Sequence, residues 1–148
     1  MAFVNSNDFL TGRRPARFPS GAEIVCQRAS VDLTTGDLVS NNFGAVGLLP
    51  AGCVMTGLKV DADDLDSGTG TLTLDVGILN AAGTGFDVTF ATGLTVGASA
   101  GVVEVLSANM LRMSANSTTD RKIGVRINAA PNVAQAGTLF LHSEYRAV

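Results

Sequence analysis

Residues 43–60 read FGAVGLLPAGCVMTGLKV, two apolar runs divided by Pro50-Ala51-Gly52. Proline and glycine between apolar runs are typical of a tight turn that joins two strands. In the second run Val54, Leu58 and Val60 alternate with Met55, Gly57 and Lys59. We therefore predict a strand, a turn and a strand, a unit that fixes the register of its neighbours.

The clearest period-two pattern follows in residues 71–79. Side chains of a strand point alternately to its two faces, so this pattern predicts one face in the core and one in water. The expected core positions are Leu72, Leu74, Val76 and Ile78, and the expected wet positions are Thr71, Thr73, Asp75 and Gly77.

Further strand candidates, separated by turn signals, occur on both sides of these two segments. No helical pattern of useful length and no internal repeat appears between them. The candidates are residues 22–33, 86–90, 102–106, 109–114, 122–127 and 138–146. About eight short strands predict an all-β, antiparallel sandwich or barrel, and this strand number favours a jelly-roll-like sandwich.

Composition agrees with this fold class. The chain has 148 residues, enough for one domain with a core, and its 17 glycines against one tyrosine and no tryptophan suit short strands with many turns. Cys26 and Cys53 are expected to be reduced thiols, because residues 1–4 lack the features of a signal peptide. No apolar run is long enough to span a bilayer, so no membrane partner is expected. Synthesis in the cytoplasm is expected for the same reason as the reduced thiols.

Residues 1–20 form a basic segment that differs from the remainder. They hold Arg13, Arg14 and Arg17 against Asp8, whereas residues 21–148 carry seven basic and twelve acidic side chains. An acidic body repels phosphate, so nucleic acid is an improbable partner for the whole domain. We predict an extended N-terminal arm at 1–20, a β-sandwich domain at 21–148, and a protein surface as the partner of the arm.

The arm also contains three aromatic residues among Asn, Ser, Gly and Pro. A freely solvated segment is expected to carry fewer large apolar side chains than Phe3, Phe9 and Phe18. The arm is therefore predicted to dock on a protein surface. Its own domain is one candidate surface, and another protein is the other.

The sequence contains one pattern typical of hydrolases. Residues 97–101 satisfy G-x-S-x-G around Ser99, and Asp120 and His142 follow in hydrolase order. A nucleophile elbow requires a helix directly after the serine, whereas the β-branched residues 102–105 indicate a strand. We therefore predict a loop of small residues and no enzymatic activity.

Metal and cofactor sites are not predicted either. Asp61, Asp63, Asp64 and Asp66 could offer oxygens to Ca²⁺, but the spacing does not fit an EF-hand, so a solvated acidic turn is the prediction and a loose Ca²⁺ site the alternative. A single histidine without a cysteine at ligand spacing does not indicate a zinc site. No phosphate-binding or dinucleotide motif occurs, so the expected cofactors are none.

Four segments together resemble the decoration, or cement, proteins of tailed-bacteriophage heads, which are small virion proteins. The resemblance covers most of residues 22–146 and consists of patterns of Leu, Pro, Gly and Tyr. The segments are GLLPAGCVM at 47–55, the alternating strand at 71–79, DRKIGV at 120–125, and 137–146 from GTLFL to EYR.

The resemblance implies a jelly-roll-like body on the capsid surface, without enzymatic activity. It implies the major capsid protein as partner, and a homo-oligomer, with a trimer favoured and a dimer possible. The arm would reach onto neighbouring capsid subunits, where the residues expected to bind are Phe3, Phe9 and Phe18 in pockets and Arg13, Arg14 and Arg17 at carboxylates. The alternative function is a host-surface or carbohydrate-binding module of a virion or tail.

Overall fold

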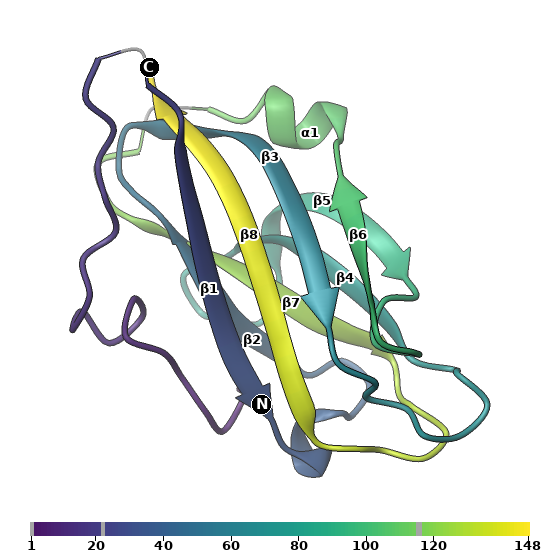
Figure 1. Cartoon of the computed structure of the whole chain (residues 1–148). Coiled ribbons are helices and arrows are strands. Elements are labelled where there is room, and N and C mark those ends of the chain that lie inside the picture. Colours follow the sequence, from purple (N-terminus) through teal and green to yellow (C-terminus); the bar gives the residue numbers. More distant parts are fainter. Residues whose placement is uncertain (1, 22, 115–116) are drawn as a thin grey trace.

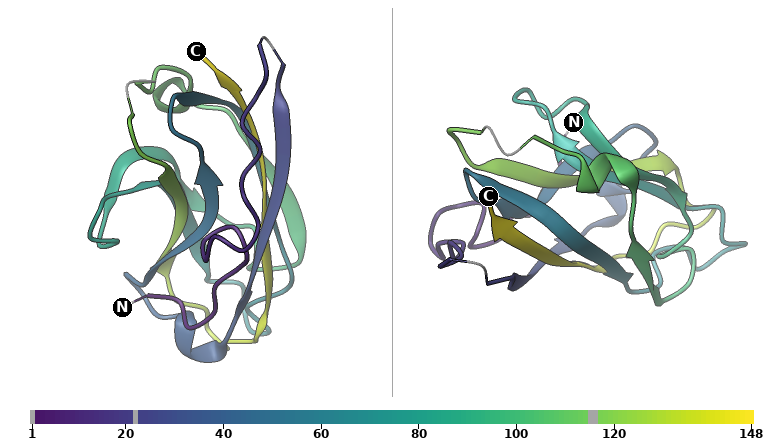
Figure 2. Two further views of the ribbon diagram at one scale, coloured as in Figure 1. Left: turned by 90° about the vertical axis from the view of Figure 1, so that its left-hand side faces the viewer. Right: turned by 90° about the horizontal axis from the view of Figure 1, so that it is seen from above.

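The computed structural model describes residues 2–21, 23–114 and 117–148 and consists of two antiparallel β-sheets packed face to face (Figures 1 and 2). The first sheet has the order β1 (Val25–Leu33), β8 (Gly137–Ala147), β3 (Cys53–Ala62) and β6 (Gly101–Val105). The second has the order β2 (Phe43–Leu49), β7 (Arg121–Ala129), β4 (Thr73–Leu79) and β5 (Phe86–Leu94).

The order of the strands is that of a jelly roll. From β1 to β4 each new strand lies in the opposite sheet, β5 pairs with β4, and the last three strands again alternate between the sheets. Every neighbouring pair is antiparallel. The predicted all-β, jelly-roll-like sandwich of about eight strands is confirmed.

The predicted turn at residues 50–52 is present, but it connects the two sheets. Cys53 N donates to the Pro50 carbonyl at 3.2 Å, and Gly52 has a φ of +75°, which a residue without Cβ adopts at little cost. The strands on either side, β2 and β3, do not pair with each other, so this unit is a corner of the sandwich and does not set the pairing register.

Apolar side chains from both sheets fill the space between them. Leu58, Val60, Leu139, Leu141 and Tyr145 from the first sheet, and Leu49, Leu74, Val76, Ile123 and Ile127 from the second, are at most 1% exposed. These are positions of one parity in each strand, which is why the alternating patterns identified β3, β7 and β8.

The prediction of a wet face at residues 71–77 is wrong for Asp75 and Gly77, whereas Thr71 is exposed and Thr73 half-buried. Asp75 is 4% exposed, pairs with Arg126 at 3.5 Å, and accepts a hydrogen bond from Gly93 N at 2.9 Å. The ring of Phe86 in β5 lies on Gly77, where a side chain would collide with the β5 backbone and with this ring. Since β5 folds closely over a glycine, the outer face of β4 is covered.

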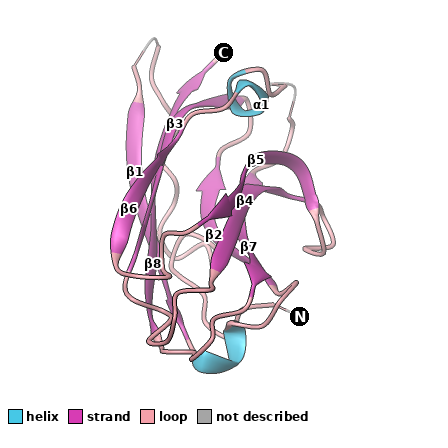
Figure 3. Ribbon diagram, turned by 90° about the vertical axis from the view of Figure 1, so that its right-hand side faces the viewer, coloured by secondary structure: helices cyan, strands magenta, loops and turns pink. Residues whose placement is uncertain are grey.

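The predicted strand at residues 109–114 is also wrong, because this segment begins with the short helix α1 (Ala108–Leu111), drawn in Figure 3. The side chain of Ser107 accepts a hydrogen bond from Met110 N at 3.2 Å, and such N-caps stabilise a helical turn. Met110 is fully buried, and Asn109 Nδ2 donates to the Thr89 carbonyl of β5 at 3.2 Å, so the helix is fastened to the sandwich. A second short helix, η1 (Thr35–Asp37), follows β1.

Candidate functional site

The N-terminal arm lies along the side of the sandwich where β1 and β2 are the edge strands (Figures 1 and 2). Asn7 Nδ2 donates to the carbonyl of Ser30 in β1 at 3.1 Å and to that of Val46 in β2 at 2.7 Å. Asn5 Nδ2 donates to the carbonyl of Asp32 at 2.7 Å. The arm therefore bridges the two sheets at their open edge.

Two of the three arm phenylalanines pack on the chain's own domain. Phe3 is 9% exposed, and its ring occupies the space that a side chain at Gly44 would need. Phe9 is 8% exposed, and the guanidinium of Arg14 lies 5.0 Å from the centre of its ring. The sequence left open whether the arm docks on its own domain or on another protein. The side chains of Phe3 and Phe9 dock on the chain's own domain.

The remaining predicted residues of the arm face solvent. Phe18 is 57% exposed, and Arg13, Arg14 and Arg17 are exposed as well. Arg17 pairs with Glu23 at 3.3 Å in an arrangement that surface screening makes weak. We call Arg13, Arg14, Arg17 and Phe18 the arm strip, an apolar side chain among three cations on one short stretch of chain.

A buried tyrosine holds the backbone of the arm strip in place. Tyr145 Oη donates to the Arg17 carbonyl at 2.7 Å and also lies 3.0 Å from the side-chain amide of Gln27. Burial raises the pKa of Tyr145 to about 12, so the phenol keeps its proton at neutral pH. The sequence gives no sign of this contact, which joins residues 128 positions apart.

Asp66 in the predicted solvated turn is buried, so the prediction is wrong for this residue. It is 2% exposed, and its carboxylate accepts hydrogen bonds from the backbone N–H groups of Gly68, Thr71, Leu72, Asn132 and Val133. Burial acts to raise the pKa of Asp66, but the backbone hydrogen bonds outweigh it and hold the pKa well below its usual value of 3.8. Asp66 thus ties two loops together.

The three candidate hydrolase residues lie in different parts of the sandwich. Ser99 is exposed in the turn that precedes β6, so a strand and not a helix follows it. Asp120 accepts a hydrogen bond from Ala51 N at 2.9 Å, at the corner between β2 and β3. His142 lies on β8, opposite Arg28 of β1 and Lys59 of β3. Ser99 therefore does not stand on a nucleophile elbow.

The remaining predictions concern metal ions, cysteines and membrane spans. In the part of the chain that the structure describes, no group of three or more His, Cys, Asp or Glu side chains is placed to hold a metal ion. Cys26 and Cys53 form no disulfide there, and burial raises the pKa of the Cys53 thiol. None of the described helices is long and apolar enough to cross a membrane.

Comparisons with known proteins place this geometry in context. No protein-family model and no curated protein matches the chain. A chain in the capsid of Ralstonia phage GP4 is similar, with a TM-score of 0.80 and 27% identity over 95% of this chain and 96% of that one. A chain in the capsid asymmetric unit of cyanophage Pam1 has a TM-score of 0.64 at 17% identity, over 90% and 95% of the two chains, and at that identity supports the fold alone. The chain is thus similar in structure to phage capsid proteins, which supports a structural role in a virion.

Proposed function

We propose that the chain is a decoration, or cement, protein that binds the outer surface of a phage capsid and reinforces the shell. The observation that carries this proposal is the similarity to a chain of the Ralstonia phage GP4 capsid, which covers 95% of this chain and so includes most of the arm with the sandwich. Among the described residues Ser99 is followed by a strand and no metal-binding group is placed, which suits a protein that acts through its surface.

The arm strip is the surface that we assign to the major capsid protein. Phe18 is an exposed aromatic anchor of the kind that fills a pocket at an interface, and the three arginines suit carboxylates around such a pocket. Because Phe3 and Phe9 are buried against the sandwich, their part in binding is to position the strip. The bridge made by Asn7 serves the same purpose, since a preorganised arm loses less entropy on binding.

Repetition strengthens this attachment. As the resemblance to cement proteins implies, we propose a homotrimer at symmetry axes of the shell, with one arm from each copy on a neighbouring capsid subunit. Linked binding sites raise the overall affinity well above that of a single arm without any new type of contact. Many such clusters would stiffen a shell against internal pressure.

The carbohydrate-binding alternative has less support. A sugar stacks on the exposed face of an aromatic ring, and Phe18 of the arm is the one aromatic among the exposed large apolar side chains of the described residues. On the domain, Phe43 and Phe86 pack against each other with ring centres 5.3 Å apart, and Arg126 covers Phe43. Their faces are therefore used within the chain.

Replacing Phe18 with alanine should weaken binding to the shell. A buried anchor of this size contributes about 2 kcal/mol or more, so each contact should weaken about 30-fold. The measurement is cosedimentation of the full chain with empty heads that lack it, across a range of concentrations. Val133→Ala is the matched control, because Val133 is 50% exposed and lies outside the arm. Equal binding by Phe18→Ala and the wild type would exclude Phe18 as an anchor.

A further inference from the structure

The outer edge of β1 is only partly covered by the arm. Backbone groups of alternate residues point to the same edge of a strand. The arm contacts the carbonyls of Asp32 and Ser30, so Arg28 and Cys26, which have the same parity, also direct their backbone groups to this edge. In the described residues no backbone or side-chain group of the arm forms a hydrogen bond with these two. The stretch at 26–28 is therefore an open strand edge.

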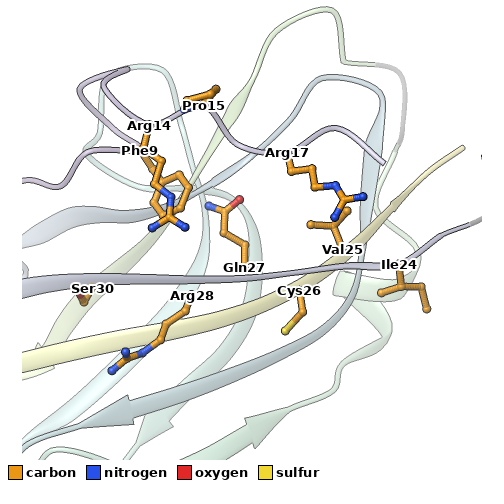
Figure 4. Close-up of a pocket in the computed structure, with 10 residues that line it drawn as sticks. All are labelled: Phe9, Arg14, Pro15, Arg17, Ile24, Val25, Cys26, Gln27, Arg28 and Ser30. Atoms are coloured by element: carbon orange, nitrogen blue, oxygen red, sulfur yellow. The ribbon is translucent and has the colours of Figure 1, made fainter. Parts of the chain in front are cut away.

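A cavity of about 590 Å³ lies along this open stretch, between the arm and β1 (Figure 4). Three arginines line it, and no acidic residue does. Arg17 already has Glu23 as partner, but no described carboxylate lies within ion-pair distance of Arg14 or Arg28. Both free guanidiniums are held by aromatic rings, Arg14 on Phe9 and Arg28 at 4.3 Å over Phe140. One positioned positive charge, that of Arg14, thus lies on the arm side of β1, and the other, that of Arg28, lies on the opposite side of the strand.

Gln27 adds a buried polar group without a partner. It is 6% exposed, and in Figure 4 its side chain extends from β1 toward the arm, whereas Arg28 and Cys26 leave the strand on the other side. One end of its amide contacts Tyr145 Oη, and the other end, Nε2, is buried with no hydrogen-bond partner among the described residues. A peptide group carries one donor and one acceptor, so it can satisfy this amide in either orientation.

We propose that the cavity between the arm and β1 binds an extended acidic peptide segment, which adds as a strand to the β1 edge at residues 26–28. Main-chain hydrogen bonds would join the segment to Cys26 and Arg28, as in other cases of strand addition. Because the side chains of a strand alternate, adjacent carboxylates reach Arg14 on one side and Arg28 on the other. That the segment belongs to a capsid subunit rests on the proposed function.

A blocked, fluorescent peptide of sequence TVEDVT tests the site, with TVQNVT and a backbone N-methylated TVEDVT as controls. Fluorescence anisotropy with the full chain should detect binding of the first peptide and at least about tenfold weaker binding of both controls. The double variant Arg14→Ala/Arg28→Ala should bind TVEDVT at least about tenfold more weakly. Arg112→Ala and Arg146→Ala, which remove exposed charges outside both the cavity and the arm strip, should bind it as the wild type does.

Equal binding of TVEDVT and either control peptide would overturn the proposal, and so would a double variant that is folded and binds normally. Displacement of TVEDVT by inorganic phosphate or by a single-stranded oligonucleotide of equal charge, at equal concentration, would show a general anion site and would also overturn it. Cosedimentation with empty heads distinguishes a failure of this peptide site from a failure of the proposed function. A wild type that sediments with heads but ignores TVEDVT refutes only this site, whereas one that binds TVEDVT but no heads refutes the proposed function.

Discussion

Replacing Asp66 with alanine should lower the melting temperature by about 10 °C. The change leaves five backbone N–H groups without the carboxylate that accepts their hydrogen bonds, and those of Leu72 and Val133 come from separate loops. Buried N–H groups without a partner are costly, so the contact between the loops should weaken, with the backbone bonds from Ser67 N to the Val133 carbonyl and from Gln135 N to the Leu65 carbonyl left to hold them. Thermal unfolding followed by circular dichroism measures the effect.

Asp87→Ala is the matched control for this variant. Asp87 is exposed on β5, and no hydrogen bond or ion pair involves it among the described residues, so its loss should leave the melting temperature nearly unchanged. If Asp66→Ala had the same melting temperature as the control and the wild type, the carboxylate would not hold the two loops together.

The lowered pKa of Asp66 predicts how the stability of the fold depends on pH. This pKa is lowered in the folded chain, so the unfolded chain binds more protons once the pH falls below its usual value of 3.8. The stabilisation is therefore complete above that value and decreases as the pH falls toward the lowered pKa. Between about pH 5 and about pH 2.5, the melting temperature of the wild type should fall more steeply than that of Asp66→Asn. Parallel curves would contradict the assignment.

Replacing Gly44 with valine should release the beginning of the arm from the sandwich. The ring of Phe3 fills the space above Gly44, so any added side chain in β2 must displace it. Released residues at the beginning of the arm should become good substrates for chymotrypsin, and we expect cleavage after Phe3 at least about tenfold faster than in the wild type. Mass spectrometry of a digestion time course identifies the sites.

Gly101→Val provides the comparison, because it places the same side chain on β6 where an added Cβ meets no atom within 4 Å. It should be cut like the wild type. An arm that stays protected in Gly44→Val would mean that Phe3 is not what fastens it. The released variant also tests positioning, since it keeps every residue of the arm strip but should bind heads more weakly.

The sequence predicts most of this fold because the buried residues of β1, β3, β7 and β8 alternate on one parity. The same rule fails for β4, where the residue that covers Gly77 is Phe86 of the next strand. Whether a second layer forms over a face depends on contacts between strands, which a pattern within one strand does not contain. The helix at Ala108–Leu111 was missed because it is too short to show a helical period and is held by a cap, the buried Met110 and a bond from Asn109 to the Thr89 carbonyl.

The arm shows the same limit on predicting a site. Composition identified three aromatic side chains that needed a surface, but not that Gly44 makes room for Phe3 or that Asn7 spans two sheets. The arginines were recognised as a group from the positive charge of residues 1–20. Gln27 and Arg28 were not, because they come next to the arm only when β1 forms the edge of the first sheet.

Electron cryo-microscopy of empty heads mixed with the purified full chain tests the central claim most directly. The account predicts added density on the outer surface at one class of symmetry axis, in clusters into which three copies of the sandwich fit, with residues 13–18 against a neighbouring shell subunit. Heads that show no added density at saturating protein, or density only on tail or fibre components, would contradict the assignment as a capsid decoration protein.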